Sequence, residues 1–273
     1  MNTIKINETP IRTSRNFKIN NITINAPEIP EKINEFQNVQ ITTQSTNCEE
    51  TVENLPFTYG IGEEQEAEIT KLTNNKISIK TDKKENIKII YTFDEQNKYL
   101  INNIEFNLKE DANIIIEYRT NTEKECYHNG KIKVIANDNA NVNVTIVNFL
   151  NIASTHLEAV ENEIKNSANV HYTVMDFGGK YSVTNYYSNL IGEKAENEIN
   201  TVYLGAKDQV KDINYIAELR GPKTKMNMEL QGALKDESKK NFKGTIDFKK
   251  GSKKAKGTEN EACMLLSDKA KSL

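Results

Sequence analysis

Three residues that can bind a transition metal lie at related positions in the middle of the chain. Cys126 stands two residues before His128, and His156 follows His128 after 28 residues. Residues two apart in an extended chain point to the same side, so Cys126 and His128 share a face. One thiolate and two imidazoles form a partial ligand set for iron, zinc or an iron–sulfur cluster. The alternative is a hydrogen-bonded pair of stacked histidines beside a small apolar cysteine.

No other residues form a recognisable catalytic or metal site. The sequence contains neither the GxSxG turn of a serine nucleophile nor the GxxxxGK[ST] loop that holds phosphates. His171 falls on the exposed side of its strand. Cys48 and Cys263 have no histidine or acid at a useful spacing, and we expect Cys263 to pack against its apolar neighbours. We therefore predict no catalytic residues and a protein that is not an enzyme.

Composition excludes two classes of partner. The 36 Lys and Arg against 39 Asp and Glu give a net charge of -3, and only four residues are arginine, so nucleic acid is not an expected partner. No apolar run is long enough to cross a membrane or to act as a signal peptide. Three cysteines without a CxxC pair fit a reducing compartment, which predicts a cytoplasmic location.

Short strands that recur with a regular period would bring the two histidines together. Each copy has a polar turn followed by alternating apolar residues, as in NIIIEYRT, NVNVTIVN and NVHYTVMD. Successive copies are 27, 28, 28, 27 and 29 residues apart, so the period is about 28. The anchors of the six copies, one at each turn, are Glu85, Ala112, Ala140, Ala168, Ala195 and Thr224.

Apolar residues occupy matching positions around these anchors. Of the 24 residues that lie eight before or two, four and six after an anchor, 22 are apolar or aromatic, where a 37% hydrophobic composition predicts about nine. Positions two, four and six share one face of a strand. Eight before the anchors lie Ile77, Ile104, Ile132, Val160, Tyr187 and Ile216; four after them lie Ile89, Ile116, Val144, Tyr172, Ile199 and Met228.

The repeat predicts a solenoid. Two short strands cannot bury an apolar face alone, but stacking repeats at roughly 4.8 Å aligns equivalent residues into a continuous interior. Parallel connections are overwhelmingly right-handed. We predict an all-β protein whose residues 71–273 form a flattened right-handed parallel β-helix after an N-terminal strap and irregular segment over 1–70. An antiparallel sandwich is the alternative, although it gives no reason for a residue class to keep one offset through six repeats.

Both ends of the chain depart from the repeat. The Pro-bearing segment APEIPEKINEF is interpreted as an extended strap followed by a short helix, and EEQEAEITKL as a brief helix or a first irregular coil. A seventh coil keeps two apolar residues and, after a longer turn, three more: Ile246, Phe248, Ala262, Met264 and Leu266.

Residues 218–270 read ELRGPKTKMNMELQGALKDESKKNFKGTIDFKKGSKKAKGTENEACMLLSDKA, and residues 13–22 read TSRNFKINNI. The first segment resembles the late β-helix run of the SUF-type iron–sulfur assembly proteins SufB and SufD, and the second is more weakly similar. The family's core is a right-handed parallel β-helix, in agreement with the repeat. The resemblance implies a non-enzymatic scaffold that pairs with a paralogue, binds the ABC-type ATPase SufC and passes nascent clusters to apo-proteins.

Two departures from the family pattern bear on these expectations. SufB-like members carry a Cys-Asp pair before the late leucine run, where this chain has Glu261 and Ala262. The resemblance therefore implies a SufD-like member in which Cys263 is not that ligand. Family members also continue into a His-containing segment and a C-terminal helical region that docks the ATPase, and we expect this chain to lack both.

The expected cargo is iron or a transient iron–sulfur cluster, with Cys126, His128 and His156 as ligands. A bare β-helix end exposes unpaired backbone groups, which predicts a homodimer or a SufB-like partner. Two other functions stay open: a β-helical carbohydrate-active enzyme and a purely structural repeat protein. The enzyme would need acids stacked in neighbouring coils beside an aromatic platform, and the sequence has no such column and no Trp.

Overall fold

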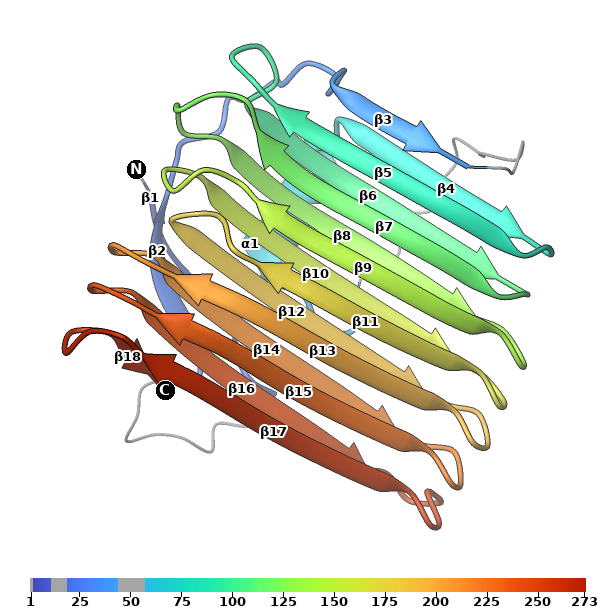
Figure 1. Cartoon of the computed structure of the whole chain (residues 1–273). Coiled ribbons are helices and arrows are strands. Elements are labelled where there is room, and N and C mark those ends of the chain that lie inside the picture. The colour runs from blue at the N-terminus through green and yellow to red at the C-terminus, as the bar shows by residue number, and fades with distance from the viewer. Residues whose placement is uncertain (1, 11–18, 44–56) are drawn as a thin grey trace.

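The computed structural model describes residues 2–10, 19–43 and 57–273, so Cys48 lies outside the described residues. The strands form a parallel β-solenoid of about seven turns with roughly 28 residues per turn, which confirms the predicted all-β fold (Figure 1). The described ranges contain one helix, α1 (Glu63–Leu72). No helix within these ranges is long and apolar enough to cross a membrane.

Each turn of the solenoid contributes one strand to each of two stacked sheets (Figure 1). The even sheet, named for its strand numbers, contains β4 (Asn75–Thr81), β6 (Tyr99–Leu108), β8 (Tyr127–Ala136), β10 (Thr155–Ile164), β12 (Tyr181–Leu190), β14 (Val210–Leu219), β16 (Lys239–Phe248) and β18 (Lys271–Ser272). The odd sheet contains β3 (Val39–Thr42), β5 (Glu85–Phe93), β7 (Ala112–Thr120), β9 (Asn141–Phe149), β11 (Asn169–Asp176), β13 (Glu196–Gly205), β15 (Lys225–Leu234) and β17 (Lys256–Leu265). All neighbours pair in parallel except β3, which is antiparallel to β5.

The turn between the even and the odd strand of a coil explains the small anchor residues. From Ala140 onward the residue before each anchor has a left-handed backbone, as with φ 67° at Asn139 and φ 53° at Ser167 before Ala168. The Ala140 N–H then closes the turn by donating to the Asn137 carbonyl oxygen at 3.0 Å. Because Ala140 is 1% exposed beneath this turn, a small side chain is favoured there.

The pairing register differs from the sequence alignment in the later even strands. Val160 pairs with Tyr186, and Tyr186 pairs with Tyr215. The prediction that Tyr187 and Ile216 continue the Val160 position is therefore wrong by one residue. The inward-facing residues at this level are the two tyrosines on the preceding positions.

Longer turns cause this shift. Five residues (191–195) separate β12 from β13, where four (165–168) separate β10 from β11. A Cβ on Gly192 would lie 2.2 Å from the Asn166 nitrogen, and one on Gly221 would lie 2.0 Å from the Gly192 carbonyl oxygen. Glycine is required because the longer turns stack on the neighbouring backbone with no room for a side chain.

A second shift occurs between β7 and β9. Ala112 pairs with Val142 rather than with Ala140, so the odd strands slide by two residues there. Asp111 accepts the Asn141 N–H at 3.2 Å in this register. Because an even shift keeps side chains on the same face, the predicted inward face is unchanged.

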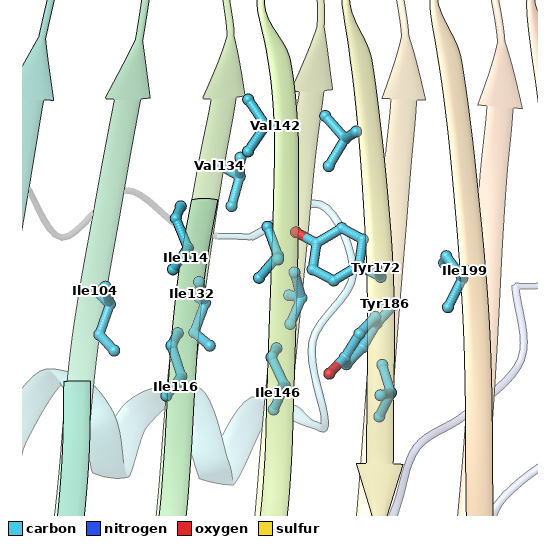
Figure 2. Packing of buried hydrophobic residues seen from close by; sticks show 14 of the residues in the cluster. Ile104, Ile114, Ile116, Ile132, Val134, Val142, Ile146, Tyr172, Tyr186 and Ile199 are labelled. Carbon is cyan, nitrogen blue, oxygen red and sulfur yellow. The ribbon is translucent and has the colours of Figure 1, made fainter. Parts of the chain in front are cut away.

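Aliphatic and aromatic side chains fill the space between the sheets. Ile104, Ile132 and Tyr186 on even strands are fully buried, as are Ile116 and Tyr172 on odd strands. Figure 2 shows these side chains projecting into the shared interior. Full burial of one such side chain contributes about 1.5–3 kcal/mol, so stacking of the coils stabilises the fold.

N-terminal residues cover the outer face of the even sheet. β1 (Asn2–Ile6) and β2 (Ile22–Ala26) form an antiparallel hairpin. Ile6 of the hairpin and Ile69 of α1 join an apolar cluster with Leu157 on the outer side of β10. This apolar cluster holds the N-terminal strap, which includes β1 and β2, against the even sheet.

Asn7 fastens the strap to the sheet. It is fully buried with φ 57°, and its Nδ2 donates to the Thr184 carbonyl at 3.1 Å and to Asp212 Oδ1 at 2.6 Å. Asn185 Nδ2 donates to Asn7 Oδ1 at 3.0 Å. Lys243 donates to the Asn7 carbonyl at 2.9 Å and pairs with Asp212, so the strap covers a buried ion pair.

The short helix predicted within APEIPEKINEF is absent. Residues 27–38 contain no helix, and the helical segment is α1, one of the two alternatives for EEQEAEITKL. Phe36 packs edge-on against Tyr91 and Phe93, with ring centroids 5.9 and 5.1 Å apart. Covering the end of the core in this way holds the segment extended.

The last odd strand, β17, presents a different face from the predicted one. Met228 pairs with Glu259 and Leu230 with Glu261, so two carboxylates occupy inward positions. Met264 points outward and is 63% exposed. The seven residues between β16 and β17 (249–255) shift the strand, so Ala262, Met264 and Leu266 do not continue the core.

Candidate functional site

His128 and His156 lie side by side in the interior on neighbouring strands β8 and β10, which confirms their predicted stacking. Their Nδ1 atoms are 2.8 Å apart, and their ring centroids are 4.6 Å apart. His128 Nε2 lies 3.1 Å from the amide oxygen of Asn102. Because that oxygen can only accept, His128 carries its proton on Nε2, and its Nδ1 accepts from His156 Nδ1–H.

Both imidazoles are neutral at pH 7. Burial lowers the pKa of His156 to about 4. Burial, reinforced by His156, lowers the pKa of His128 well below the usual value. Neutral imidazole is the form that ligates metal, so the protonation state permits the predicted role.

Cys126 immediately precedes β8 and is 1% exposed. Its Sγ lies 3.6 Å from the Lys124 carbonyl oxygen, and its backbone N–H donates to Ser154 Oγ at 3.0 Å. Burial raises the pKa of the Cys126 thiol to about 11. The thiolate, which is the metal-binding form, is therefore scarce at neutral pH.

The structure brings together two of the three predicted ligands as a hydrogen-bonded pair. Within residues 2–10, 19–43 and 57–273, no group of three or more His, Cys, Asp or Glu side chains is placed to hold a metal ion. Iron binding by Cys126, His128 and His156 would require deprotonation of the thiol and replacement of the hydrogen bond between the histidines.

The histidine pair belongs to a polar file that continues along the interior. In the even sheet, His156 pairs with Ser182, which pairs with Lys211, which pairs with Lys240. Sequence reasoning missed this file because residue type changes from coil to coil. The available signal was position, since His156, Ser182 and Lys211 lie 12 or 13 residues before their anchors.

A buried ion pair crosses the interior within this file. Lys211 Nζ lies 2.9 Å from Asp176 Oδ1, and the two side chains are 0% and 4% exposed. Asn148 Nδ2 donates to the same oxygen at 2.9 Å. Lys211 also donates to the Gly178 carbonyl at 3.3 Å, so the ammonium has two acceptors.

Glu158 is an acid enclosed in the same interior, with 1% exposure. Tyr186 OH donates to its Oε1 at 2.8 Å, whereas its Oε2 has no partner in the described part of the chain. Burial raises the pKa of Glu158 to about 7. Thr184 Oγ1 also lacks a partner there, so the interior has unused hydrogen-bonding capacity that fits ordered water.

The polar file reaches the last coil at Lys240. Its ammonium pairs with Glu261 and lies 5.7 Å from the ring centroid of Tyr203. Burial lowers the pKa of Lys240 to about 8. Cys263 is partly buried and packs against the core, as expected.

His171 lies away from this file, on the outer side of β11. Its side chain is 43% exposed and its Nε2 lies 3.0 Å from Asn200 Nδ2. The prediction of an exposed position is confirmed. His171 is therefore a matched control for the buried pair.

Comparison with known proteins adds one match. A protein-family model described as SUF system FeS cluster assembly, SufBD core domain, matches residues 91–273. The matched range contains the histidine pair, the buried ion pair and the last coil. No match was found among curated proteins.

Proposed function

This chain belongs to the SufBD core-domain family of SUF iron–sulfur cluster assembly, and from that premise we propose that it is a non-catalytic scaffold component. It acts in a complex with a paralogous partner and a SufC-type ATPase. Within the family it is closer to SufD-like members, because Glu261 and Ala262 stand where SufB-like members carry a Cys-Asp pair.

The C-terminal end of the solenoid carries the proposal. Phe248 and Leu265 hold inward positions in register with the buried Leu219 and Leu234, yet they are 51% and 52% exposed. Among described residues, β17 pairs with β15 on one side, and its other edge has no strand. Exposed apolar residues beside an unpaired strand edge are typical of a docking surface.

A SufB-like paralogue or a second copy of the chain is the proposed occupant of this end. Either one would cover Phe248 and Leu265 and complete the hydrogen bonding of β17 by adding a strand. SufC-type ATPase binding is proposed from family membership.

A scaffold role agrees with where the titratable groups lie. Glu158 and Asp176 are enclosed between the sheets, where they cannot exchange protons directly with a substrate at the surface. A cytoplasmic location suits the free thiols of Cys126 and Cys263, which stay reduced there.

Iron or a nascent cluster is the cargo in this proposal, with Cys126, His128 and His156 as its ligands in this chain. Anaerobic incubation with iron and sulfide, followed by absorption and Mössbauer spectra, tests the assignment. We expect cluster signal in the wild type and in His171→Ala, and a loss of at least half in Cys126→Ala and in His128→Ala. An unchanged spectrum in both latter variants would contradict the ligand assignment.

A further inference from the structure

Basic residues gather along one side of the solenoid, where the chain turns from an even strand into the following odd strand. These turns stack in a row at the right of Figure 1. We call residues 191–196, 220–225 and 249–256, in the last three such turns, the basic ridge. It holds nine Lys or Arg and two acids, whereas the turns on the opposite side (206–210, 235–239 and 266–271) hold five and four. The ridge is therefore a local positive surface on a chain of net charge -3.

Backbone geometry fixes the spacing of these charges. Lys194, Lys223 and Lys254 occupy the left-handed position of their turns, with φ 58°, 60° and 60°. Lys194 N–H donates to the Pro222 carbonyl oxygen at 2.9 Å, and Lys223 N–H donates to the Lys253 carbonyl oxygen at 2.8 Å. Because successive coils are about 4.8 Å apart, equivalent lysines leave the ridge at that interval.

Carboxylates neutralise the lysines of the ridge only in its earlier coils. Glu193 Oε1 lies 2.7 Å from Lys223 Nζ in the next coil, and Glu196 Oε1 lies 2.6 Å from Lys225 Nζ. One coil later, the positions equivalent to these two acids are held by Pro222 and by Lys225 itself. The last coil of the ridge therefore receives no acid from the coil before it.

Four lysines of that coil are left without a counter-charge. Lys250, Lys253, Lys254 and Lys256 are exposed, and none forms an ion pair or a side-chain hydrogen bond within the described ranges. Lys256 also stacks in register on Lys225 of the neighbouring strand. Like charges at facing positions repel each other, so an anion bound between them would be stabilising.

Carboxylates suit the ridge better than nucleic-acid phosphates do. Glu193 and Glu196 already show carboxylates bridging neighbouring coils there. The only arginine, Arg220, is occupied by Glu218 and by the amide oxygen of Asn189 at 3.0 Å. The ridge also contains no aromatic residue on which a base could stack.

We propose that the basic ridge binds an acid-rich segment of a partner protein, whose Asp or Glu side chains pair with Lys194, Lys254 and Lys256. Such complementarity speeds association and selects the partner by charge. The ridge runs along the side of the solenoid over three coils, so this inference is independent of the proposed docking at the end and of the proposed cargo ligands.

Fluorescence anisotropy with a labelled decaglutamate peptide at about 50 mM salt tests this. The ridge variant combines Lys194→Gln, Lys254→Gln and Lys256→Gln. The control variant removes the same charge from the opposite side through Lys207→Gln, Lys235→Gln and Lys269→Gln. We expect salt-sensitive binding to the wild type, at least roughly tenfold weaker binding to the ridge variant, and a change below about twofold in the control. The ridge variant should unfold at or above the wild-type temperature, because it loses repulsion.

Four results would overturn the proposal. The first is no binding of decaglutamate to the wild type, and the second is an equal loss in the ridge and control variants. The third is tighter binding of a single-stranded oligothymidylate of equal charge, which would make the ridge a phosphate-binding surface. The fourth is sedimentation of the wild type with phosphatidylserine vesicles that is lost in the ridge variant while peptide binding is unchanged, which would indicate a membrane surface.

Discussion

Lys211 and Asp176, on facing sheets, form an ion pair at 2.9 Å inside the solenoid. Neither charge can be hydrated there, so each is stabilised by the other. Replacing Lys211 with Met leaves the Asp176 carboxylate unpaired, and we expect the free energy of unfolding to fall by about 3–5 kcal/mol. Urea unfolding measures this loss. Lys211→Met combined with Asp176→Asn should lose less than the single variant; equal losses would contradict a direct pairing.

The histidine pair makes the fold sensitive to acid. Both imidazoles are neutral when folded and have lowered pKa values, whereas the unfolded histidines protonate near pH 6.5. The unfolded state therefore binds more protons below pH 6.5, and stability present above that pH is lost toward pH 4. Between these two pH values the free energy of unfolding falls by about 1.4 kcal/mol per pH unit for each histidine. We expect a shallower slope for His156→Gln and the wild-type slope for His171→Gln; identical slopes in all three proteins would argue against this account.

Glu158 has the opposite pH dependence. Its folded pKa of about 7 lies above the unfolded value near 4.5, so the unfolded state loses its proton first as the pH rises. Stability present below pH 4.5 is lost up to about pH 7. Gln keeps an acceptor for Tyr186 and cannot ionise, so Glu158→Gln should gain about 2–3 kcal/mol over wild type between pH 4.5 and 7.5. A stability difference that is constant with pH would show that this acid does not titrate in the interior.

Gly221 permits the longer turn between β14 and β15. A Cβ there would lie 2.0 Å from the Gly192 carbonyl oxygen in the adjacent coil. We expect Gly221→Ala to reduce stability by about 1–3 kcal/mol. Thermal unfolding measures this. Ser252→Ala, in the turn of the next coil, is the control, and an equal effect of both changes would rule out the backbone contact as the cause.

The solenoid could be predicted from two repeating signals: the alternation of apolar residues along the strands and, at four of the six anchors, an alanine beneath the turn. Ala140 and Ala168 show the second signal, since both follow a residue with left-handed backbone. The same period placed His128 beside His156. The local alternation of apolar residues therefore predicts, for most strands, which side chains point into the interior.

Other features depended on contacts that a repeat does not encode. Gly192 lengthens a turn by one residue, which moves Tyr186 rather than Tyr187 into line with Val160. The extended course around Phe36 is set by aromatic packing. The polar file was not recognised, because a register position held by histidine in one coil is held by lysine in another.

Complex formation tests the central claim most directly. The chain would be mixed anaerobically with a SufB-like paralogue and a SufC-type ATPase from the same organism, and the masses in solution measured by light scattering. We predict a stable assembly that contains all three proteins. Elution of the folded chain alone, whatever the salt concentration and with or without iron, would contradict a role as a SUF scaffold component.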